Sequence, residues 1–523
     1  MKRDFSGLES PFDLLICGGG IHGAWTAYDA ALRGLKVALV ERGDWGSATS
    51  SASSKLIHGG LRYLEAFDFR MVRKSLGERR MLSRVAPHCV WPLRFGLPVY
   101  AHARHGTWKL KAGLTLYDLL AGLPDERMRH HHLNVVDFSE RFPFLNGNGL
   151  KGGFTYGDSQ TDDARLVLEL VAGAMEHGAT CVNHAEITEW IEENGRVRGA
   201  TVQDKMSGAV LRVLAKECVS ASGQWAAATS QSRHWCRLTK GVHLVLPALP
   251  VKDVNEALLL TAERDGRVFF MLPWYGRTLL GTTDTDYRGD VNDRLEVGDD
   301  DADYLLSAAN HFLRTPWTRR DVIASFAGLR VLKQSEKSAP SAVSRDWELR
   351  TADNGLHYSI GGKLTTARED AAFIVDAVCA GLGRKDRCST WGRDFPWKPS
   401  GDFAAWSEEA CTQARRLGVD AESAEWLMRR HGSRVAQVFS ILEETPGLAE
   451  RIVPDVPLIH ADLILCAREE MVQHLSDLLR RRMPLLILAK LDEKDIRRLA
   501  EQVAPEMGWD TARISQEVKD CCG

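Results

Sequence analysis

The chain has 523 residues, which is too many for one simple core at roughly 100–200 residues per domain, so we expect two or three domains. Hydrophobic residues make up 44% and charged residues 26% of the chain, which argues against a disordered, fibrous or membrane-integral class. The net charge of −3 excludes the broad basic surface of a nucleic-acid binder, so an anionic ligand would need a local cluster of cations. The eleven cysteines are scattered without CxxC spacing, which indicates a reducing, cytoplasmic compartment.

The N-terminal forty residues carry a nucleotide-binding pattern. An apolar segment over 12–17 precedes three glycines in GxGxxG spacing, a helical stretch and a second apolar segment that ends at Glu41. Gly18 permits the tight turn, Gly20 lets a pyrophosphate approach the backbone, and Gly23 lets helix and strand pack closely. Glu41 is placed to accept hydrogen bonds from a ribose diol. The pattern predicts dinucleotide binding, and both FAD and NAD satisfy it.

A segment rich in hydroxyl groups follows over 46–63 and ends in paired glycines before Arg62. Small hydroxyl side chains let a bulky ligand approach and can donate hydrogen bonds to it, which suits a pyrophosphate and a flavin ring. The alternative is a flexible serine-rich linker. The cofactor-binding candidates in this segment are Thr49, Ser50, Ser54, Lys55, Leu56, His58, Gly59 and Gly60.

The middle of the chain alternates between predicted helices and strands. Residues 64–85 are expected to be helical, whereas the prolines over 86–150 predict irregular structure there. A strand over 152–158 is followed by a helix that opens at Asp162, and the alternating segments beyond it, together with 240–290, predict a second, interleaved sheet.

The C-terminal part, from about residue 397, is richer in helix formers. Apolar residues at i, i+3, i+4 and i+7 over 433–442 and again over 468–479 predict amphipathic helices. We therefore expect a helical C-terminal domain.

Several motifs together carry a resemblance to a known family. They are GGGIHGAWTAYDAALRGL, ATSSASSKLIHGGLRYLE, DDARLVLEL, KGVHLVLP, FFMLPWYGRTLLGTTDTDY, GLRVL, SIGGKLTTARE and the C-terminal HGSRVAQV and REEMVQHLSDLLRRR, and they run through nearly the whole chain. The sequence resembles the FAD-dependent, respiratory glycerol-3-phosphate dehydrogenases of the D-amino-acid-oxidase-like flavoprotein superfamily. That resemblance implies FAD as cofactor and oxidation of sn-glycerol 3-phosphate to dihydroxyacetone phosphate. Hydride would pass to the flavin N5, and electrons would pass on to membrane quinone.

The fold class that we expect is mixed α/β, with three regions. A discontinuous Rossmann-like FAD-binding domain would comprise 1–85, 150–225 and 325–390. A β-rich substrate domain interleaved with it would comprise 86–149 and 226–324, and a helical C-terminal domain would comprise 397–523.

The resemblance also implies a substrate pocket lined by cations, which a phosphorylated substrate requires. The substrate-binding candidates are Arg62, Tyr63, Arg330, Arg345 and Lys363. For any one cation the alternative is a solvated surface charge.

For the catalytic step, His243 is the candidate base, because imidazole accepts a proton near neutral pH. Arg330 is the other catalytic candidate and would stabilise the alkoxide electrostatically. The alternative for His243 is a structural histidine that is hydrogen-bonded in the core.

The remaining cofactor candidates are Gly223 and the turn of Gly362, Lys363, Leu364 and Thr365. The helix after that turn would place its positive end near the flavin and favour its anionic reduced form. The three consecutive histidines over 130–132 cannot share a helix face, so we predict no metal site.

Two motifs depart from the family pattern. An ATGPW-like segment reads SASGQW over 220–225, and a GVRPL-like segment reads GLRVL over 328–332, so that each loses a proline. These departures leave substrate choice less certain than flavin binding.

No signal peptide and no apolar run near 18 residues is found in the sequence. A basic amphipathic stretch over 108–123 could rest on an anionic leaflet or be an ordinary packed helix. We therefore expect a cytoplasmic protein, peripheral on the inner face of the cytoplasmic membrane, with no nucleic-acid partner and with room for a homodimer.

Two alternative functions remain open. The first is a flavin oxidase or dehydrogenase of another hydroxy acid, polyol or amine. The second is a catalytically silent flavoprotein scaffold.

Overall fold

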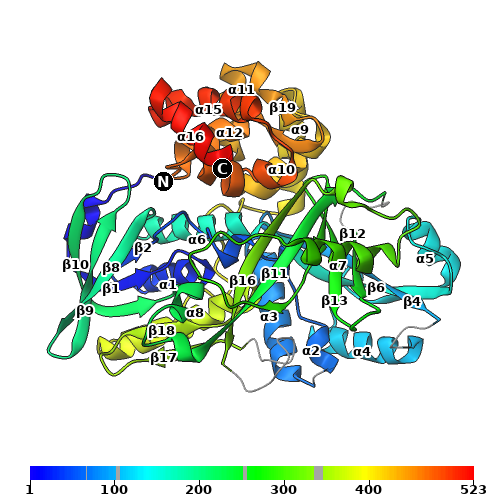
Figure 1. Ribbon diagram of the computed structural model, residues 1–523, viewed down its shortest axis with the longest axis horizontal. Coiled ribbons are helices and arrows are strands. Elements are labelled where there is room, and N and C mark those ends of the chain that lie inside the picture. Colours follow the sequence, from blue (N-terminus) through cyan, green and yellow to red (C-terminus); the bar gives the residue numbers. More distant parts are fainter. Residues whose placement is uncertain (66, 102–105, 251–255, 335–345, 523) are drawn as a thin grey trace.

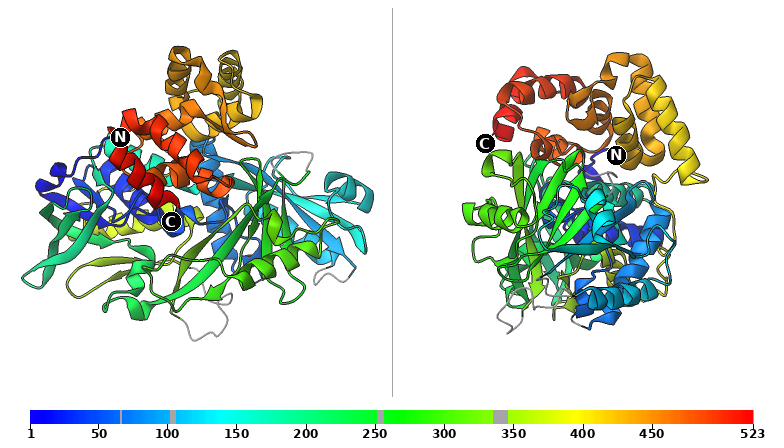
Figure 2. Two further views of the ribbon diagram at one scale, coloured as in Figure 1. Left: turned by 45° about the horizontal axis from the view of Figure 1, so that its top comes forward. Right: turned by 90° about the vertical axis from the view of Figure 1, so that its right-hand side faces the viewer.

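The computed structural model describes residues 1–65, 67–101, 106–250, 256–334 and 346–522. Two β-sheets lie side by side with helices around them, and the C-terminal helices form a separate layer above (Figure 1). Figure 2 shows from two further directions that this helical layer packs on one side of the two-sheet body. The predicted mixed α/β class, with an interleaved β-rich region and a helical C-terminal region, is confirmed.

The first sheet is built on a βαβ unit at the N-terminus. Its central strand β1 (Phe12–Cys17) pairs in parallel with β2 (Val37–Val40) and β10 (Val210–Ser220), and α1 (Ile21–Leu32) makes the crossover from β1 to β2. The strands at the centre are almost continuously apolar because α1, α6 (Asp163–Glu176) and α8 (Ala367–Gly381) pack together over them. In spatial order the main strands are β17 (Glu348–Thr351), β18 (His357–Ile360), β10 (Val210–Ser220), β1 (Phe12–Cys17), β2 (Val37–Val40) and β7 (Thr180–Val182), and β8 (Ala185–Glu193) and β9 (Arg196–Asp204) extend β10.

The second sheet is mostly antiparallel and has ten strands among the described residues. In spatial order they are β15 (Thr285–Asp286), β11 (Cys236–Pro247), β14 (Arg277–Gly281), β13 (Val268–Trp274), β12 (Glu256–Thr261), β4 (Val90–Tyr100), β6 (Leu150–Thr161) and β3 (Leu56–Ile57), with β16 (Ala324–Lys333) beside β11 and β5 (His131–Leu133) beside β6. Helices α2 (Arg62–Glu65), α3 (Phe69–Val85), α4 (Thr107–Leu120), α5 (Val135–Arg141) and α7 (Asp299–Asn310) lie around this sheet.

Three expectations for this part of the chain need correction. The boundaries predicted at 150 and 325 assign β6 and β16 to the cofactor domain, but β6 pairs with β4 and β16 pairs with β11, so both belong to the second sheet. The helix predicted over 64–85 is interrupted before α3, because Phe67 has a left-handed backbone with φ of 57°.

The third correction concerns β4, an eleven-residue strand in the region that was expected to be irregular. Its two prolines, Pro92 and Pro98, pair with β6 on one side. On the other side, within the part of the chain that the structure describes, β12 pairs only with residues 94–96, so neither proline has a described ladder partner at that edge. Proline is tolerated in a strand at such positions, which is why its presence does not break the element.

The C-terminal region is helical, as predicted, apart from one short hairpin. Its elements are α9 (Phe403–Arg416), α10 (Ala421–His431), α11 (Val435–Glu444), α12 (His460–Glu469), α13 (Leu475–Asp477), α14 (Leu485–Leu488), α15 (Glu493–Met507) and α16 (Thr511–Cys522), with β19 (Arg451–Val453) and β20 (Val456–Ile459). The helix predicted over 468–479 is broken between α12 and α13, where Met471 is left-handed with φ of 51° and the buried Glu470 side chain turns to Arg165.

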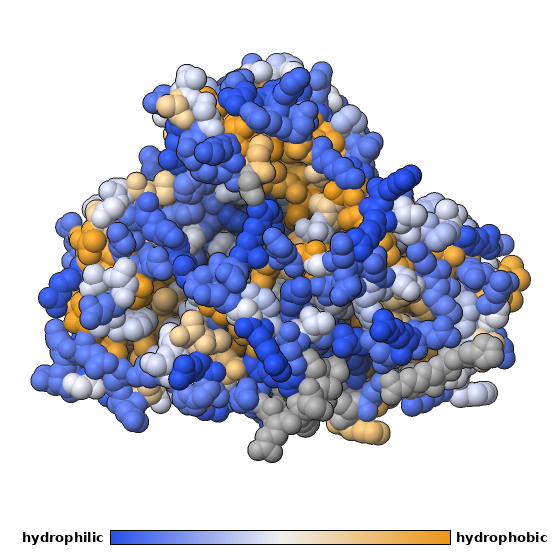
Figure 3. Space-filling view, viewed as in Figure 1, coloured by the Kyte–Doolittle hydropathy of each residue, from blue (hydrophilic) through white to orange (hydrophobic). Residues whose placement is uncertain are grey.

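The surface facing the viewer in Figure 1 is mostly hydrophilic, and apolar residues gather on it in the hollow beneath the C-terminal helices (Figure 3). Across the described ranges, no helix combines the length and the apolar character needed to cross a bilayer.

Candidate functional site

A cavity of about 970 Å³ lies where the two sheets meet. The first sheet contributes the carboxyl ends of its parallel strands, at Cys17, Val40 and Ser220. The second sheet contributes side chains from one face, among them Tyr156 and Phe270. The carboxyl edge of a parallel sheet, where neighbouring connections diverge, is the usual ligand site of this architecture.

The glycine loop between β1 and α1 forms one wall of the cavity. A Cβ at Gly18 would lie 2.5 Å from the Ala221 carbonyl oxygen, and one at Gly23 would lie 1.8 Å from that of Gly18, so neither position admits a side chain. Glu41 stiffens this loop, because its carboxylate accepts hydrogen bonds from the Gly19 and Gly43 amides at 2.6 and 2.7 Å. Burial raises the pKa of Glu41.

The hydroxyl-rich segment forms the floor beside the glycine loop. Ser50 Oγ accepts a hydrogen bond from the Ile21 amide in the first turn of α1, at 2.9 Å. Thr49 Oγ1 donates to the Leu329 carbonyl in β16, at 2.6 Å. This segment therefore ties the first sheet to the second across the cavity, which a flexible linker would not do.

The turn of Gly59 and Gly60 continues the wall and depends on Asp158 in β6. Asp158 is 1% exposed and accepts hydrogen bonds from the Gly59 amide, from Arg79 and from the Tyr117 hydroxyl. These three donors come from separate elements, and they fix the turn from behind.

The turn over 361–365, which precedes α8, lines the cavity next to the segment of His58. The His58 amide donates to Thr365 Oγ1 at 3.2 Å, and a Cβ at Gly362 would lie 2.5 Å from His22 Nε2. The close approach explains the glycine, whose φ is +96°. Since the short helical turn Leu364–Thr366 leads directly into α8, the positive end of α8 points toward the cavity.

Three cations that the sequence singled out line the same cavity although they come from separate segments: Arg62, Arg330 and Lys363. Lys363 Nζ lies 4.0 Å from the centre of the Tyr63 ring. The Arg330 guanidinium donates to Thr282 Oγ1 at 2.8 Å, to the Thr283 carbonyl at 3.0 Å and to Asp284 at 3.2 Å.

His243 lies behind the cavity wall. It is 1% exposed and does not line the cavity, but its Nε2 is 2.9 Å from Ser54 Oγ, which does. The ring stacks on Phe326 at 4.9 Å, and its Nδ1 has no hydrogen-bond partner. Burial, with the charges of Arg330 and Lys55, holds the pKa of His243 well below its usual range, so the imidazole is neutral at neutral pH.

Most of the candidate residues line the cavity. They are Gly18, Gly20, Glu41, Thr49, Ser50, Ser54, Leu56, His58, Gly60, Arg62, Tyr63, Gly223, Arg330, Gly362, Lys363, Leu364 and Thr365. Four candidates lie outside the lining: Gly23, Lys55, Gly59 and His243. Arg345 lies outside the described residues.

Lys55 differs most from the expectation that it binds the cofactor. Its Nζ is turned away from the cavity and lies 2.6 Å from Asp163 and 2.6 Å from the Ser51 carbonyl. A buried ammonium takes a carboxylate partner where one is available, and the helix that begins at Asp163 supplies it. Its direct role is therefore to hold the hydroxyl-rich segment in place.

Sequence reasoning missed several charged residues of the cavity wall. Asp158, Arg267 and Lys109 all line it. Asp158 ends a predicted strand at a GD pair, which is a weak local signal. Lys109 lies in the basic amphipathic stretch, which predicts a membrane contact or a packed helix rather than a cavity wall, and nothing near Arg267 marks that residue. The fold alone brings both to the site.

The residues present fit a dinucleotide with a flavin. The Cβ-free loop at Gly18 lets a pyrophosphate approach the backbone amides of α1. Glu41 stands at the adjoining strand end, and the α8 N-terminus faces the opposite part of the cavity. Four parts of the cavity lining would therefore hold the cofactor: the glycine loop, Glu41, the hydroxyl-rich segment and the turn over 361–365.

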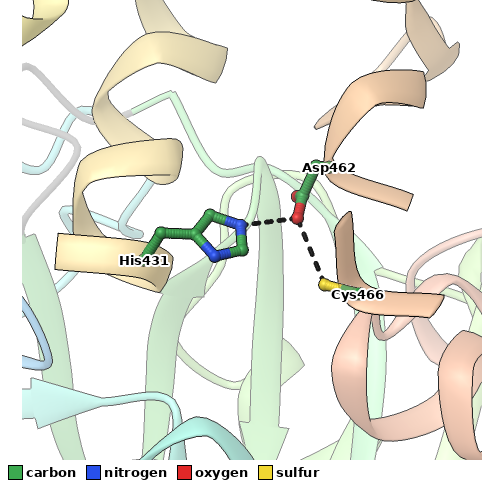
Figure 4. A group of neighbouring side chains, drawn as sticks. All are labelled: His431, Asp462 and Cys466. Atoms are coloured by element: carbon green, nitrogen blue, oxygen red, sulfur yellow. Dashed lines mark hydrogen bonds and ion pairs between the residues drawn. The ribbon is translucent and has the colours of Figure 1, made fainter. Parts of the chain in front are cut away.

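Two buried groups elsewhere have the side chains of a metal site. One joins His431 from α10 with Asp462 and Cys466 from α12, and both interactions converge on the Asp462 carboxylate (Figure 4). Arg430 occupies the same carboxylate, at 3.0 and 3.2 Å.

The second group, Asp44 with His184 and Asp477, is likewise occupied by arginines. Arg481 and Arg482 both donate to Asp44. A divalent cation in either group would lie against guanidinium groups, so both groups are structural ion-pair networks.

Comparison with known proteins agrees with this geometry. Residues 13–368 match the family described as FAD dependent oxidoreductase, and residues 400–514 match the C-terminal domain of alpha-glycerophosphate oxidase. The chain is 33% identical over 545 residues to the glycerol-3-phosphate dehydrogenase of Synechocystis sp., covering 99% of this chain and 97% of that protein. It is 35% identical over 509 residues to the aerobic glycerol-3-phosphate dehydrogenase of Bacillus subtilis, covering 92% and 90%.

Among solved structures, the chain is similar to the glycerol-3-phosphate dehydrogenase from Bacillus halodurans complexed with FAD. The TM-score is 0.77 at 30% identity, covering 98% of this chain and 94% of that one. The L-alpha-glycerophosphate oxidase from Mycoplasma pneumoniae, at a TM-score of 0.55 and 19% identity, shares the fold over 74% of this chain. The chain therefore belongs to the family of FAD-dependent oxidoreductases, takes FAD as its cofactor and carries the C-terminal domain of the alpha-glycerophosphate oxidases.

Proposed function

We propose that this protein is a glycerol-3-phosphate dehydrogenase that oxidises sn-glycerol 3-phosphate to dihydroxyacetone phosphate and passes the electrons to a membrane quinone. The observation that carries the proposal is the convergence of Arg62, Arg330 and Lys363 on the cavity that holds the FAD-binding loop. Relatives that are 33% and 35% identical over nearly their whole length are named for this substrate.

The cations bind the phosphate group of the substrate in this proposal. A phosphate dianion prefers charge-assisted hydrogen bonds, and a guanidinium offers two parallel donors where an ammonium offers a point charge. Arg330 is oriented by Thr282 and Asp284, so its position is set before substrate arrives. Lys363, which lies over the Tyr63 ring, closes the other side.

The proton step uses Ser54 and His243. Oxidation of the secondary alcohol removes one hydride from carbon and one proton from oxygen, and the bound flavin supplies the hydride acceptor. The hydroxyl proton of the substrate passes to Ser54 Oγ while the proton of Ser54 passes to His243 Nε2, at 2.9 Å. Since the pKa of His243 is lowered, the ring is neutral and able to accept it. His243 thus acts through Ser54 rather than in direct contact with the substrate.

Anaerobic titration of the purified holoenzyme tests the substrate. We expect sn-glycerol 3-phosphate to bleach the flavin absorbance, and glycerol at the same concentration to leave it unchanged, because glycerol offers nothing to the cations. Bleaching by another hydroxy acid, polyol or amine, without bleaching by glycerol 3-phosphate, would assign a different oxidoreductase. If none of these compounds reduces the flavin, the catalytically silent scaffold is favoured.

The proposal that a membrane quinone accepts the electrons rests on exposed aromatic side chains near the cavity. Phe67 and Phe69 line the cavity and are also exposed, and Trp108 at the start of α4 is 84% exposed. Exposed aromatic side chains beside Lys109 and Lys111 suit the boundary of an anionic membrane. We call Phe67, Phe69 and Trp108 the aromatic tip. Through it the protein would lie on the inner face of the cytoplasmic membrane and receive quinone.

Two measurements test the acceptor and the membrane contact. A soluble quinone analogue should reoxidise the reduced flavin faster than dioxygen does, whereas faster reoxidation by dioxygen would identify an oxidase. Sedimentation with vesicles of phosphatidylcholine and phosphatidylglycerol should retain the parent protein and lose the variant Phe67→Ser/Trp108→Ser. Val210→Ser, which removes a 56% exposed side chain from β10, is the matched control and should bind like the parent. Equal retention of all three proteins would remove the aromatic tip from the membrane contact.

A further inference from the structure

A loop that belongs to the second sheet reaches across to the first. Residues 287–295 follow β15, and the loop tip contacts the turns that follow β2 and β10. Asn292 Oδ1 accepts hydrogen bonds from Arg42 Nη1 at 3.2 Å and from Trp225 Nε1 at 2.9 Å. The Val291 carbonyl accepts one from Gln224 Nε2 at 2.8 Å. The loop therefore ties together two turns that are remote in sequence.

These two turns form one end of the FAD cavity. Arg42, Gln224 and Trp225 line it next to Glu41, the acid at the end of β2. In a Rossmann-type site that acid lies beside the adenosine ribose, so these side chains wall the adenosine end. Asn292 does not line the cavity, and it braces the wall from outside.

The loop tip is itself held in a fixed shape. Asp290 Oδ1 accepts hydrogen bonds from the amide and the side chain of Asn292, at 2.8 and 3.0 Å. Tyr287 donates to the Asp290 carbonyl at 2.8 Å. Val291, only 8% exposed, packs with Leu238 and Leu329. The side-chain nitrogen of the exposed Asn292 is thus held by Asp290. Because the amide is fixed at that end, its oxygen points to Arg42 and Trp225.

Arg42 and Trp225 also support each other. The Arg42 guanidinium lies over the Trp225 ring at 4.9 Å, and its Nη2 is 3.5 Å from Glu186 across the same cavity end. Both side chains are partly exposed, so without Asn292 the side-chain polar contacts left to them would be this mutual contact and the ion pair with Glu186, both of which are weak at such a site. The wall at this end would then be free to open.

We propose that Asn292, Arg42 and Trp225, together with the Gln224–Val291 hydrogen bond, form a clasp that closes the adenosine end of the site and retains FAD. Gln224 stands where the family pattern has proline, which carries no side-chain donor and could not make the bond to Val291. One departure of this chain from its family pattern thereby gains a physical role. The clasp depends on FAD binding alone and is independent of the proposed substrate and electron acceptor.

The rate of FAD release from the purified holoenzyme tests the clasp. After dilution, free FAD is measured by its fluorescence, which rises as the cofactor leaves the protein. Asn292→Ala should release FAD about tenfold faster, since two hydrogen bonds of ordinary strength are lost without any direct contact to the cofactor. Gln224→Ala and Trp225→Phe should each accelerate release by a smaller factor. Asn148→Ala, an exposed asparagine outside the cavity lining, should match the parent.

A double variant distinguishes a specific role of the Asn292–Trp225 hydrogen bond from a general destabilisation of the fold. In a Trp225→Phe background, Asn292→Ala should have a smaller effect than alone, because one of its two contacts is already lost. The far-UV circular dichroism spectra of the holoenzymes should coincide, which shows that all variants fold. Release from Asn292→Ala within twofold of the parent, or an undiminished effect in the Trp225→Phe background, would overturn the proposal.

Discussion

Lys55 Nζ lies 2.6 Å from Oδ1 of Asp163, and the two side chains are 2% and 0% exposed. The pair joins the hydroxyl-rich segment to the first turn of α6. The ammonium also lies 4.9 Å from the Trp274 ring and 5.4 Å from the Phe326 ring, on which His243 stacks. One buried ion pair thus supports both the cofactor loop and the proposed proton acceptor.

Replacing Lys55 by methionine should destabilise the protein strongly. The Asp163 carboxylate would remain buried without its partner, and breaking a buried pair from one side costs about 3–5 kcal/mol. The melting temperature of the holoenzyme should fall, and the double variant Lys55→Met/Asp163→Asn should recover part of the loss, because no charge then stays buried. A double variant that is no more stable than Lys55→Met would show that the ion pair is not the source of the effect.

Replacing Arg330 by lysine should raise KM for sn-glycerol 3-phosphate by roughly ten- to a hundredfold. An ammonium keeps the charge but loses the planar fork, and a hydrogen bond to a charged group contributes about 1.5–3 kcal/mol. The flavin absorbance spectrum should stay unchanged. The control Arg319→Lys alters an arginine that is paired with Asp299 and Asp303 outside the cavity lining, and its KM should equal that of the parent. A KM within twofold of the parent for Arg330→Lys would leave Arg330 as a brace for Thr282 and Asp284.

Replacing His243 by asparagine should slow anaerobic flavin reduction by about 10²–10⁴-fold, the usual range for loss of a general base. Ser54→Ala should slow the reaction similarly, and the double variant should be no slower than either single variant, because the two groups act in one relay. If the rate reduction in the double variant equals the product of the two single reductions, the two side chains act separately.

The same relay sets the pH dependence. The pKa of His243 is depressed by burial and by two neighbouring cations, so the imidazole stays neutral below pH 6.5. Flavin reduction by the parent should therefore show no loss assignable to His243 as the pH falls from 8 to 6.5. A titration of the rate constant centred near pH 6.5, absent from His243→Asn, would contradict this.

How far the sequence predicts the fold depends on how local each signal is. The glycine loop, α1 and Glu41 could be predicted because about thirty consecutive residues specify them. The long strand β4 could not, since its pairing with β6 and β12, not its own proline-rich sequence, makes it a strand. The same holds for the domain boundaries at β6 and β16, which are set by partners far along the chain.

The site residues likewise fall into those that a local motif predicts and those that only the fold reveals. Arg62, Arg330 and Lys363 were found through motifs, and the structure places them at one cavity. Asp158 was missed because its role is to accept from Gly59, which lies 99 residues earlier. Lys55 was assigned to the cofactor because its motif surrounds the cofactor, but its side chain turns to a carboxylate 108 residues away. A motif identifies which backbone forms a site and does not reveal which way each side chain turns.

The C-terminal region is joined to the two-sheet body by a buried charge network. Arg430 donates to Asp462 and to the Tyr275 hydroxyl, and Tyr275 donates to Asp162 at the start of α6. His431 adds a hydrogen bond of 2.7 Å to Asp462. These contacts fix the helical layer to both sheets.

The protonation of His431 makes the stability of the folded protein depend on pH. Burial lowers the pKa of His431 to about 4, against an ordinary value of 6.5, with Arg165 and Arg430 acting in the same direction and Asp462 opposing them. Between these two pH values the unfolded chain binds a proton that the folded chain does not. The stabilisation is therefore fully present above pH 6.5 and is lost as the pH falls toward 4, by an amount on the order of 3 kcal/mol.

Urea unfolding of the full-length holoenzyme, followed by far-UV circular dichroism at pH 7.0 and pH 5.0, tests this dependence. The parent should lose more stability between the two pH values than His431→Gln, whose amide can still donate to Asp462 but does not titrate. His460→Gln replaces a histidine of the same region that is hydrogen-bonded to the neutral Gln502, and it should follow the parent. Because every other titrating group is shared by the proteins compared, their contributions cancel. Equal losses for the parent and His431→Gln would mean that His431 takes up its proton in the folded state as readily as in the unfolded chain.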